Sequence, residues 1–340
     1  MPSTQSGKVL VSGANGFVAT WVVQTFLDAG FSVRGTVRSA AKGRHLKRFF
    51  APYGDKFELV VVPDITATGA FDEAVQGVDA IAHTASPFHL CADDPAAFSA
   101  PAVQGTIGIL ESARKYGRGV RRVVITSSAV AVSDMTVKED SGALDEFHWN
   151  TAAVQAVSEK SADTGNLDKY CNSKVLAERG AWEFLDRYRT EVGWDIAVLN
   201  PPLVLGPVIH EGPSPAGLNT STKMMFNAFF TTEGLKTSGG QWANVKDVGR
   251  AHLLAVMTEL PDYVPLAAGF AWQDLLDAVP ASATHYQKGF PGSITTEMWP
   301  RHMDNTRAQE VLGMEYTSMH ETVEETLADY ESRGWIKACN

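Results

Sequence analysis

The sequence predicts an α/β protein built on a doubly wound parallel sheet, with a smaller lobe toward the C-terminal end. Short apolar runs rich in β-branched residues alternate with longer segments of helical periodicity throughout the first 200 residues. This alternation is typical of parallel strands that are buried on both faces and joined by crossover helices. The length of 340 residues corresponds to about two folding units at roughly 150 residues each, which leaves room for a second lobe.

Six short apolar runs are the candidate strands of the sheet. They occupy residues 8–12, 32–36, 57–62, 80–83, 122–126 and 195–199. Helical periodicity fills the connections: Val18, Val22 and Phe26 share one face of a helix predicted over 17–29, and apolar residues recur in the same way over 103–113. Because such connections cross over right-handed, this order builds an open sheet with helices on both faces.

The pattern changes from about Pro201 onward. Proline and glycine cluster over 201–217, methionine and phenylalanine cluster over 224–230, and further helices are predicted over 244–257 and 321–330. We therefore expect a main unit of residues 1–200 with about 243–258, and a second lobe of residues 201–242 with 259–340.

The composition excludes several classes of protein. The 29 Lys and Arg residues against 39 Asp and Glu give a net charge of −10, which repels the phosphate backbone of nucleic acids. No apolar run approaches the ~18 residues of a membrane-spanning helix. The three cysteines lack the spacing of a disulfide framework or a zinc site, and His83, His148, His210 and His252 lack that of metal ligands. We expect a cytosolic protein, monomeric or homodimeric, without nucleic-acid, membrane or metal binding.

A glycine-rich turn directly follows the first strand. It reads Gly13-Ala14-Asn15-Gly16-Phe17-Val18-Ala19 and opens a helix. Small residues let the backbone turn sharply and approach a pyrophosphate, whose charge the amide groups of a helix N-terminus can hold. A glycine pair by itself is as often a tight turn without a ligand. Here the second strand ends about twenty residues later, as in Rossmann dinucleotide-binding domains, so we predict dinucleotide binding.

The end of the second strand indicates which nicotinamide cofactor is bound. NAD-selective domains place Asp or Glu there, whereas a 2′-phosphate requires positive charge. Residues 33–38 read VRGTVR and are followed by Lys42 and Arg44, with no carboxylate among them. The planar guanidinium of Arg38 can bind the phosphate, and Lys42 or Arg44 can add charge. The alternative is a solvated basic helix start; we predict NADPH.

Later strand ends supply further candidate contacts to the cofactor. Asp64 follows the third strand and is a candidate partner of the adenine amino group, although an ordinary turn Asp is the alternative. Residues 82–86 end the fourth strand, and ligands of such sheets lie outside the carboxyl ends of the strands. We therefore expect this segment to line the dinucleotide.

The candidate catalytic residues come from the fifth strand and a later helix. Thr126, Ser127 and Ser128 end that strand, and the four-residue spacing of Tyr170 and Lys174 places both on one helix face. A phenol titrates near pH 10, so its use as an acid and base at neutral pH requires its pKa to fall by up to ~3 units, about 4 kcal/mol. A nearby ammonium can supply much of this. An exposed Tyr and Lys pair is the alternative when the spacing stands alone.

Together these motifs resemble the extended short-chain dehydrogenase/reductase family, closest to its branch of plant dihydroflavonol reductases and fungal carbonyl (aldehyde) reductases. The resemblance spans nearly the whole chain. Besides the glycine turn it covers residues 33–38, 83–87, 126–129, 170–174, 201–207 and 242–252. It implies that Ser128 bonds the substrate carbonyl, that Tyr170 gives the proton, and that Lys174 bonds the nicotinamide ribose and tunes Tyr170.

The resemblance also completes the set of expected cofactor contacts. It implies that Pro201, Leu203 and Val204 lie against the nicotinamide carboxamide, and that Arg38 contacts the 2′-phosphate. The expected NADPH-binding residues are Gly13, Asn15, Gly16, Phe17, Val18, Arg38, Lys42, Asp64, Ile65, Thr84, Ala85, Ser86, Thr126, Ser127, Pro201, Leu203 and Val204.

Two positions depart from the family pattern. Many members carry an Asn that holds a proton-relay water where this chain has Ala102, so any relay must use backbone groups or another side chain. Plant flavonoid reductases place an Asn that reads the substrate hydroxyls where this chain has Ser133. The second departure favours a carbonyl reductase over a dihydroflavonol reductase.

We predict NADPH-dependent reduction of ketones or aldehydes to alcohols, with a small-molecule carbonyl compound as the partner. The expected pocket residues are Phe88, Ser133, Phe226 and Trp242, although the cluster over 224–230 is more typical of a core than of a pocket. The alternatives are a dihydroflavonol-type reductase, a sugar-nucleotide epimerase or dehydratase, and a cofactor-sensing regulator. Residues 201–242 contain only Lys223 and Lys236 as cations, few for a nucleotide diphosphate, and the Ser, Tyr and Lys set argues against a regulator.

Overall fold

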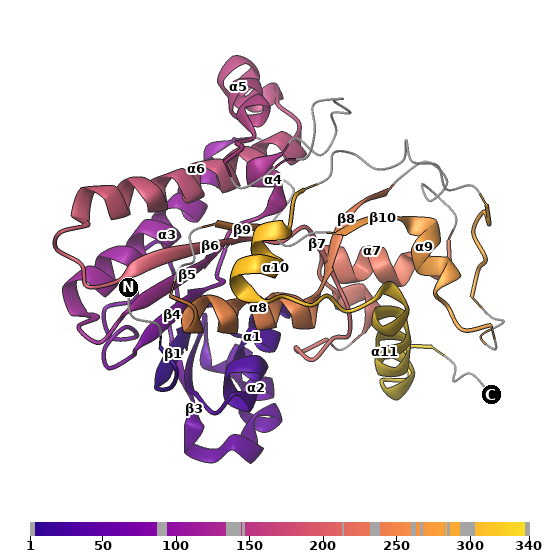
Figure 1. The fold of residues 1–340 in the computed structure, drawn as a ribbon, viewed down its shortest axis with the longest axis horizontal. Coiled ribbons are helices and arrows are strands. Elements are labelled where there is room, and N and C mark those ends of the chain that lie inside the picture. Colours follow the sequence, from indigo (N-terminus) through magenta and orange to yellow (C-terminus); the bar gives the residue numbers. More distant parts are fainter. Residues whose placement is uncertain are drawn as a thin grey trace.

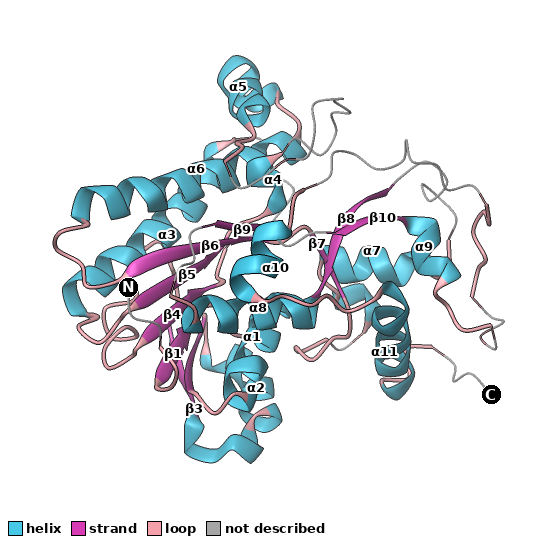
Figure 2. Cartoon of the chain, in the orientation of Figure 1, coloured by secondary structure: helices cyan, strands magenta, loops and turns pink. Residues whose placement is uncertain are grey.

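In the computed structural model the chain forms a parallel sheet that is covered by helices on both faces, with a smaller lobe beside it (Figure 1). The described residues are 4–86, 94–133, 144, 147–212, 214–231, 239–259, 263–265, 268–281, 283, 286–292 and 303–336. Figure 2 shows that the strands form two separate sheets, one in each part of the molecule.

The main sheet contains seven parallel strands. In spatial order they are β3 (Phe57–Val61), β2 (Ser32–Val37), β1 (Lys8–Val11), β4 (Ala80–His83), β5 (Arg122–Thr126), β6 (Asp195–Asn200) and β9 (Tyr263–Pro265). The six predicted strands are confirmed, with ends that differ by at most one residue. The seventh, β9, was not predicted, because three residues that end in a proline are too short to give a strand pattern.

Helices cover both faces of this sheet. On one face lie α1 (Phe17–Asp28), α2 (Arg44–Phe49), α8 (Val245–Met257) and α10 (Thr306–Leu312), and on the other lie α3 (Ala96–Tyr116) and α6 (Asn166–Tyr188). Val9 packs in a core with Phe26 and Val248, whereas its neighbour Leu10 packs in a second core with Ile109. Successive strand side chains thus enter opposite cores, which explains why the strands read as continuous apolar runs.

The smaller lobe is built around a second sheet of three strands. Its strands are β7 (Leu203–Leu205), β8 (Gly239–Asn244) and β10 (Ala268–Ala271), and its helices are α7 (Thr220–Ala228), α9 (Trp272–Asp277) and α11 (Met319–Ser332). β8 pairs parallel with β7 and antiparallel with β10. A capping box fixes the start of α11, where the Ser318 side chain accepts from the Glu321 amide and the Glu321 side chain accepts from the Ser318 amide.

Short helices complete the described chain. They are η1 (Ala40–Gly43), η2 (Ala51–Lys56), α4 (Ala129–Val132), α5 (Thr151–Lys160), η3 (Ser161–Asp163) and η4 (Pro215–Gly217). The α4 turn matters most for the site, because it begins directly after Ser128 at the carboxyl end of β5.

Part of the range predicted for the second lobe packs with the main sheet instead. β9 pairs with β6, and α10 contacts α8 and β9. Ala308 and Leu312 of α10 are buried in the same apolar core as Val248, which explains their position. The predicted boundary at residue 259 is therefore wrong for these two segments.

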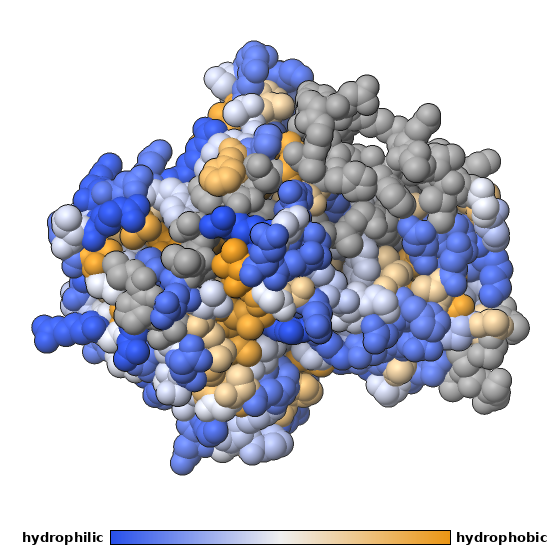
Figure 3. Space-filling model, in the orientation of Figure 1, coloured by the Kyte–Doolittle hydropathy of each residue, from blue (hydrophilic) through white to orange (hydrophobic). Residues whose placement is uncertain are grey.

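The described residues were also compared with the requirements of a membrane-spanning helix. None of their helices combines the length and the apolar character that a bilayer crossing requires, and hydrophilic residues are spread over the face seen in Figure 3. The same residues contain no group of three or more His, Cys, Asp or Glu side chains arranged to hold a metal ion.

Candidate active site

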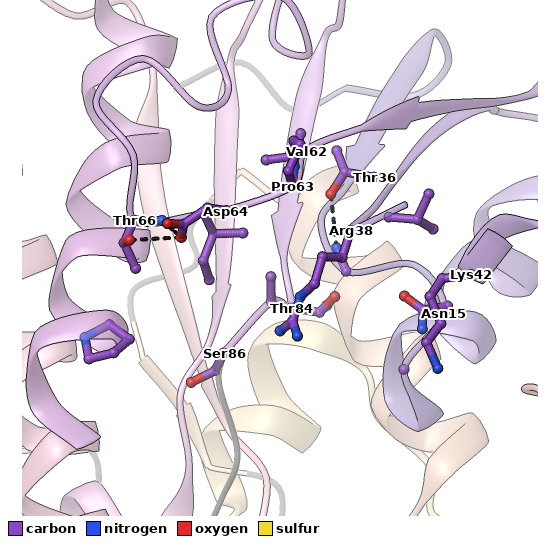
Figure 4. Close-up of a pocket in the computed structure, with 16 residues that line it drawn as sticks. Asn15, Thr36, Arg38, Lys42, Val62, Pro63, Asp64, Thr66, Thr84 and Ser86 are labelled. Carbon is purple, nitrogen blue, oxygen red and sulfur yellow. Dashed lines mark hydrogen bonds between the residues drawn. The ribbon is translucent and has the colours of Figure 1, made fainter. Parts of the chain in front are cut away.

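A cavity of about 780 Å³ lies at the carboxyl ends of the central strands (Figure 4). It is lined by Gly13, Asn15, Gly16, Thr36, Val37, Arg38, Lys42, Val62, Pro63, Asp64, Ile65, Thr66, Thr84, Ala85, Ser86 and Pro101. Ten of the predicted cofactor-binding residues are among them: Gly13, Asn15, Gly16, Arg38, Lys42, Asp64, Ile65, Thr84, Ala85 and Ser86. The structure thus brings most of the predicted dinucleotide site together.

The glycine turn forms one wall of this cavity. Gly13 has φ +65°, and a Cβ at this position would lie 3.1 Å from Ala85 Cβ, so the turn requires glycine. The Gly13 amide donates to Thr36 Oγ1 over 3.0 Å, which ties the turn to the end of β2. α1 begins at Phe17 after Gly16, without a side-chain cap. Its first amide groups therefore remain available to an anion such as a pyrophosphate.

Positive charge lies where a 2′-phosphate requires it. Arg38 follows β2 and Lys42 lies on η1; both are exposed side chains that line the cavity. In Figure 4 the Arg38 side chain extends into the cavity, with Asp64 and Thr66 on the opposite side from Lys42. Arg44, the other predicted cation, is exposed but is not among the lining residues. These residues fit a dinucleotide that carries a 2′-phosphate.

Asp64 is the one carboxylate among these lining residues. It accepts hydrogen bonds from the Thr66 amide over 2.9 Å and from Thr66 Oγ1 over 2.7 Å. These two bonds hold the pKa of Asp64 below its usual value, with a smaller contribution from the charge of Arg38. Asp64 therefore forms a local turn and also faces the cavity, so its contact with adenine stays a prediction.

The predicted catalytic residues converge at the end of β5. Ser128 caps α4, with its Oγ 3.4 Å from the Val130 amide and from the Pro201 carbonyl oxygen. A hydrogen bond joins the side chains of Ser128 and Tyr170. Lys174 Nζ lies 5.9 Å from the centre of the Tyr170 ring. Three residues from two distant segments thus form one polar group beside the strand ends.

The protonation of Tyr170 differs from the sequence-based expectation. Burial raises the pKa of Tyr170 to about 12, and the hydrogen bond from Ser128 only partly opposes this effect. The predicted lowering of the pKa of Tyr170 is therefore wrong for this structure, because the loss of solvation on burial has the largest effect on this phenol. Tyr170 keeps its proton at neutral pH, which is the state that a proton donor requires.

Several other residues that are predicted to lie near the nicotinamide form hydrogen bonds within the protein. The Ala129 amide donates to the Pro201 carbonyl oxygen over 2.9 Å, so the segment after β6 lies beside Ser128. Thr126 Oγ1 lies 2.7 Å from His252 Nε2, and the Ser127 hydroxyl donates to Glu178. Contacts of Phe17, Val18, Thr126, Ser127, Pro201, Leu203 and Val204 with NADPH stay predictions.

The predicted pocket residues have mixed surroundings. Phe88 lies outside the described residues. Trp242 is 6% exposed in the core of the smaller lobe, and Ser133 is buried, with its carbonyl oxygen bonded by Asn150. Phe226 is half-buried, with ring centroids 5.0 Å from Phe230 and 5.3 Å from Tyr330. Phe226 is therefore the most accessible pocket candidate of the three described residues.

Sequence reasoning missed two buried polar residues beside Lys174. Glu178 follows Lys174 by one helical turn, and Asn200 ends β6; Asn200 Nδ2 donates to Glu178 Oε2 over 3.0 Å. Burial lowers the pKa of Lys174 to about 8, and the charge of Glu178 opposes that effect. The four-residue spacing between Lys174 and Glu178 places both on one face of a helix, and this was the sequence signal that could have identified Glu178.

The sequence was compared with known protein families and with known proteins. A sequence model of the NAD dependent epimerase/dehydratase family matches residues 9–263. The NADPH-dependent methylglyoxal reductase of Saccharomyces cerevisiae is 34% identical over 335 residues, covering 94% of this chain and 96% of that protein. A ketoreductase of Aspergillus niger is 33% identical over 341 residues, covering 93% and 95%.

A solved structure shows the same likeness in three dimensions. The crystal structure of the yeast methylglyoxal/isovaleraldehyde reductase complexed with NADPH matches with a TM-score of 0.83 at 32% identity. The match covers 97% of this chain and 100% of that chain. The likeness therefore includes both the main sheet and the smaller lobe.

Proposed function

Because the chain belongs to the NAD dependent epimerase/dehydratase family, we propose that its site reduces ketones and aldehydes through Ser128, Tyr170 and Lys174. The chain is an NADPH-dependent carbonyl reductase, and its relatives include an NADPH-dependent methylglyoxal reductase and a ketoreductase. One observation carries the assignment of residues: Tyr170, hydrogen-bonded to Ser128, stands at the same edge of the sheet as the cavity that Arg38 lines.

Two sets of groups on the cavity wall would hold the cofactor. The uncapped amide groups at the start of α1 would bind the pyrophosphate, and Arg38 with Lys42 would bind the 2′-phosphate. Bound NADPH supplies the hydride for the carbonyl carbon.

Ser128 and Tyr170 act on the oxygen of the substrate. The Ser128 hydroxyl donates a hydrogen bond to the carbonyl oxygen and stabilises the negative charge that develops there. Tyr170 then transfers its proton to this oxygen. An alkoxide is more basic than a phenolate, so the transfer is favourable even from a phenol whose burial raises its pKa to about 12.

Lys174 stabilises the phenolate form of Tyr170. After the transfer Tyr170 is a phenolate in a buried site, where an uncompensated charge is costly. The ammonium of Lys174, 5.9 Å from the ring centre, lowers that cost by Coulomb attraction. Lys174 therefore contributes most when the proton has moved.

We propose apolar substrates, namely bulky aryl or alkyl ketones, ketoesters and aldehydes. The core of the smaller lobe is apolar, and besides leucine, valine and alanine it contains Met225, Phe229, Trp242, Trp272, Tyr286 and Tyr330. Lys223 is the one Lys or Arg in residues 201–212, 214–231 and 239–242, the described part of that segment. Such a lobe solvates apolar groups well and a diphosphate poorly, which disfavours the epimerase or dehydratase alternative. Ser133 likewise disfavours a dihydroflavonol substrate.

A substrate panel tests this proposal. The loss of NADPH absorbance is followed with aryl ketones, alkyl ketones, ketoesters, aldehydes and sugar nucleotides, and the alcohols are separated by chirality. We expect turnover of the apolar carbonyl compounds and none of the sugar nucleotides. Activity confined to sugar nucleotides would overturn the proposal. A cytosolic location and a monomeric or homodimeric state remain predictions from the sequence.

A further inference from the structure

A polar cluster lies beneath the reacting residues, and of its members the mechanism above uses only Lys174. It consists of His83 at the end of β4, Ser127 after β5, Lys174 and Glu178 on α6, and Asn200 at the end of β6. All five are at most 9% exposed. A cavity of about 10 Å³ touches His83, Ser127, Lys174 and Glu178. This is about the space that one buried water requires.

Glu178 is fixed in this cluster by two donors. The Ser127 hydroxyl and Asn200 Nδ2 both donate to Glu178 Oε2, the latter over 3.0 Å. Both bonds favour the ionised carboxylate, as does the charge of Lys174, whereas burial raises the pKa of Glu178 to about 7. Asn200 Nδ2 also lies 3.3 Å from the main-chain oxygen of Ser128. The carboxylate is therefore linked to the residue that bonds the substrate.

His83 contributes a hydrogen-bond donor to this cavity and no charge. Ser12 Oγ accepts from the Thr84 amide over 3.0 Å and from the Ala85 amide over 2.9 Å. The hydroxyl hydrogen of Ser12 is then left for His83 Nδ1, 2.9 Å away. Nδ1 is thus an acceptor, and Nε2 carries the hydrogen. Burial lowers the pKa of His83 to about 3, so the ring is neutral at physiological pH.

The charge balance around Lys174 follows from these neighbours. The side chains that line the small cavity come from β4 and its following loop, α3, β5 and α6; among them the titratable groups are His83, Lys174 and Glu178. Tyr170 faces Lys174 from the same helix and is protonated. His83 is neutral. Of these groups Glu178 alone can offset the positive charge of the buried Lys174.

We propose that Glu178 is a positioning residue for the reduction: fixed by Ser127 and Asn200, it keeps Lys174 protonated beneath Tyr170, across a cavity with room for one water. This inference rests on the proposed roles of Tyr170 and Lys174. A buried lysine loses its proton readily, and a neutral amine does not stabilise a phenolate. The buried water site, with donors from His83 and Lys174 and an acceptor in Glu178, gives the pair a hydrogen-bonded connection.

The first test is Glu178→Gln, which keeps the shape of the side chain and an oxygen for both donors but removes the charge. We expect the reduction rate of the unmodified enzyme to fall as pH rises through the pKa of Lys174. In Glu178→Gln we expect this alkaline limb of kcat/KM to move to lower pH by about one unit, a tenfold loss at a fixed pH on the limb. NADPH binding, followed by protein fluorescence, should weaken over the same shifted pH range. Glu178→Asp retains the charge and should restore much of the original profile.

The second test separates the charge of Glu178 from a role in packing. In a Lys174→Met background there is no ammonium to maintain, so adding Glu178→Gln should change the rate by less than about twofold. A merely structural role would cost the same factor in both backgrounds. If Glu178→Gln does not fold, Ser127→Ala provides a milder version, because it removes one donor that favours the carboxylate. It should move the limb in the same direction by a smaller amount.

The outcomes for this inference and for the proposed function are distinguishable. If Tyr170→Phe is inactive while Glu178→Gln keeps the original pH limb, or loses equal rate in both backgrounds, the inference about Glu178 is wrong and the function stands. If Tyr170→Phe keeps full activity, the proposed function itself is wrong.

Discussion

Lys174 Nζ lies 5.9 Å from the centre of the Tyr170 ring, with both residues on one face of α6. Before the reaction, the two residues differ in charge. Tyr170 holds its proton because burial disfavours the phenolate, and Lys174 is a buried cation whose charge contributes most once that proton has left. The site is therefore prepared for reduction more than for the oxidation of alcohols, which needs the phenolate at the start.

The first prediction concerns the proton donor. Tyr170→Phe removes one hydroxyl, so we expect NADPH binding to persist while turnover falls by a factor on the order of 10² to 10⁴, as for the loss of a general acid. Steady-state kinetics and fluorescence titration with NADPH measure the two effects. Tyr116→Phe is the matched control, since Tyr116 is 46% exposed on α3 and its loss should leave turnover unchanged. Near-full activity of Tyr170→Phe would mean that another group gives the proton.

The second prediction concerns cofactor choice. With Arg38 at the cavity, NADPH should be preferred over NADH by at least about tenfold in kcat/KM, or about 1.4 kcal/mol. Arg38→Ala should remove most of this preference, because the 2′-phosphate loses its planar partner. Arg44→Ala should not, since Arg44 is absent from the lining of the cavity. Equal kcat/KM with both cofactors in the unmodified protein would contradict the assignment.

The third prediction separates a pocket residue from a core residue in the smaller lobe. Phe226→Ala should change relative rates among bulky ketones more than the rate with a small aldehyde, because Phe226 is half-buried on α7. Trp242→Ala should instead lower the free energy of unfolding by about 3–5 kcal/mol, as large truncations in cores do. Unchanged relative rates in Phe226→Ala would place substrate recognition elsewhere.

The fourth prediction concerns stability at acidic pH. Burial lowers the pKa of His252 to about 4 and that of His83 to about 3, so the unfolded chain binds more protons than the folded chain below pH about 6.5. Each contributes stability that is lost as pH falls from about 6.5, by up to about 1.4 kcal/mol per pH unit. Glu178, with its raised pKa, acts in the opposite direction between about pH 4.5 and 7.

Denaturant unfolding at several pH values tests this expectation. His252→Gln keeps a donor and an acceptor and should flatten the decline of stability between about pH 6.5 and 4. Replacement of His148, an exposed residue, is the matched control and should leave the slope as it is. A slope in His252→Gln equal to that of the unmodified protein would show that His252 does not contribute.

Much of this architecture could be predicted from the sequence because its signals are local. The runs that form β1, β4, β5 and β6 are almost entirely buried, and the turn at Gly13 and the spacing of Tyr170 and Lys174 depend on neighbouring residues alone. Other features depend on distant partners. β9 forms a strand only because β6 offers it an edge, and α10 packs with α8 rather than with the smaller lobe.

The same distinction applies within the site. The raised pKa of Tyr170 follows from burial that arises only when α6 packs beside the strand ends, so its direction could not be predicted from spacing. Glu178 was missed because its partners, Ser127 and Asn200, come from two other segments. Trp242, predicted to line a pocket, lies in the core because β8 is the middle strand of the smaller sheet.

The most direct test of the account is the fate of deuterium in NADPH whose reactive carbon carries deuterium in place of both of its hydrogens. The enzyme is given labelled NADPH and an aryl ketone in ordinary water, and the alcohol is examined by mass spectrometry. If this chain reduces carbonyl compounds by direct hydride transfer with Tyr170 as the proton donor, each alcohol carries one deuterium on its carbinol carbon and NADPH is consumed in equal amount. An alcohol without the label, or turnover of a substrate without net loss of NADPH, would contradict the account.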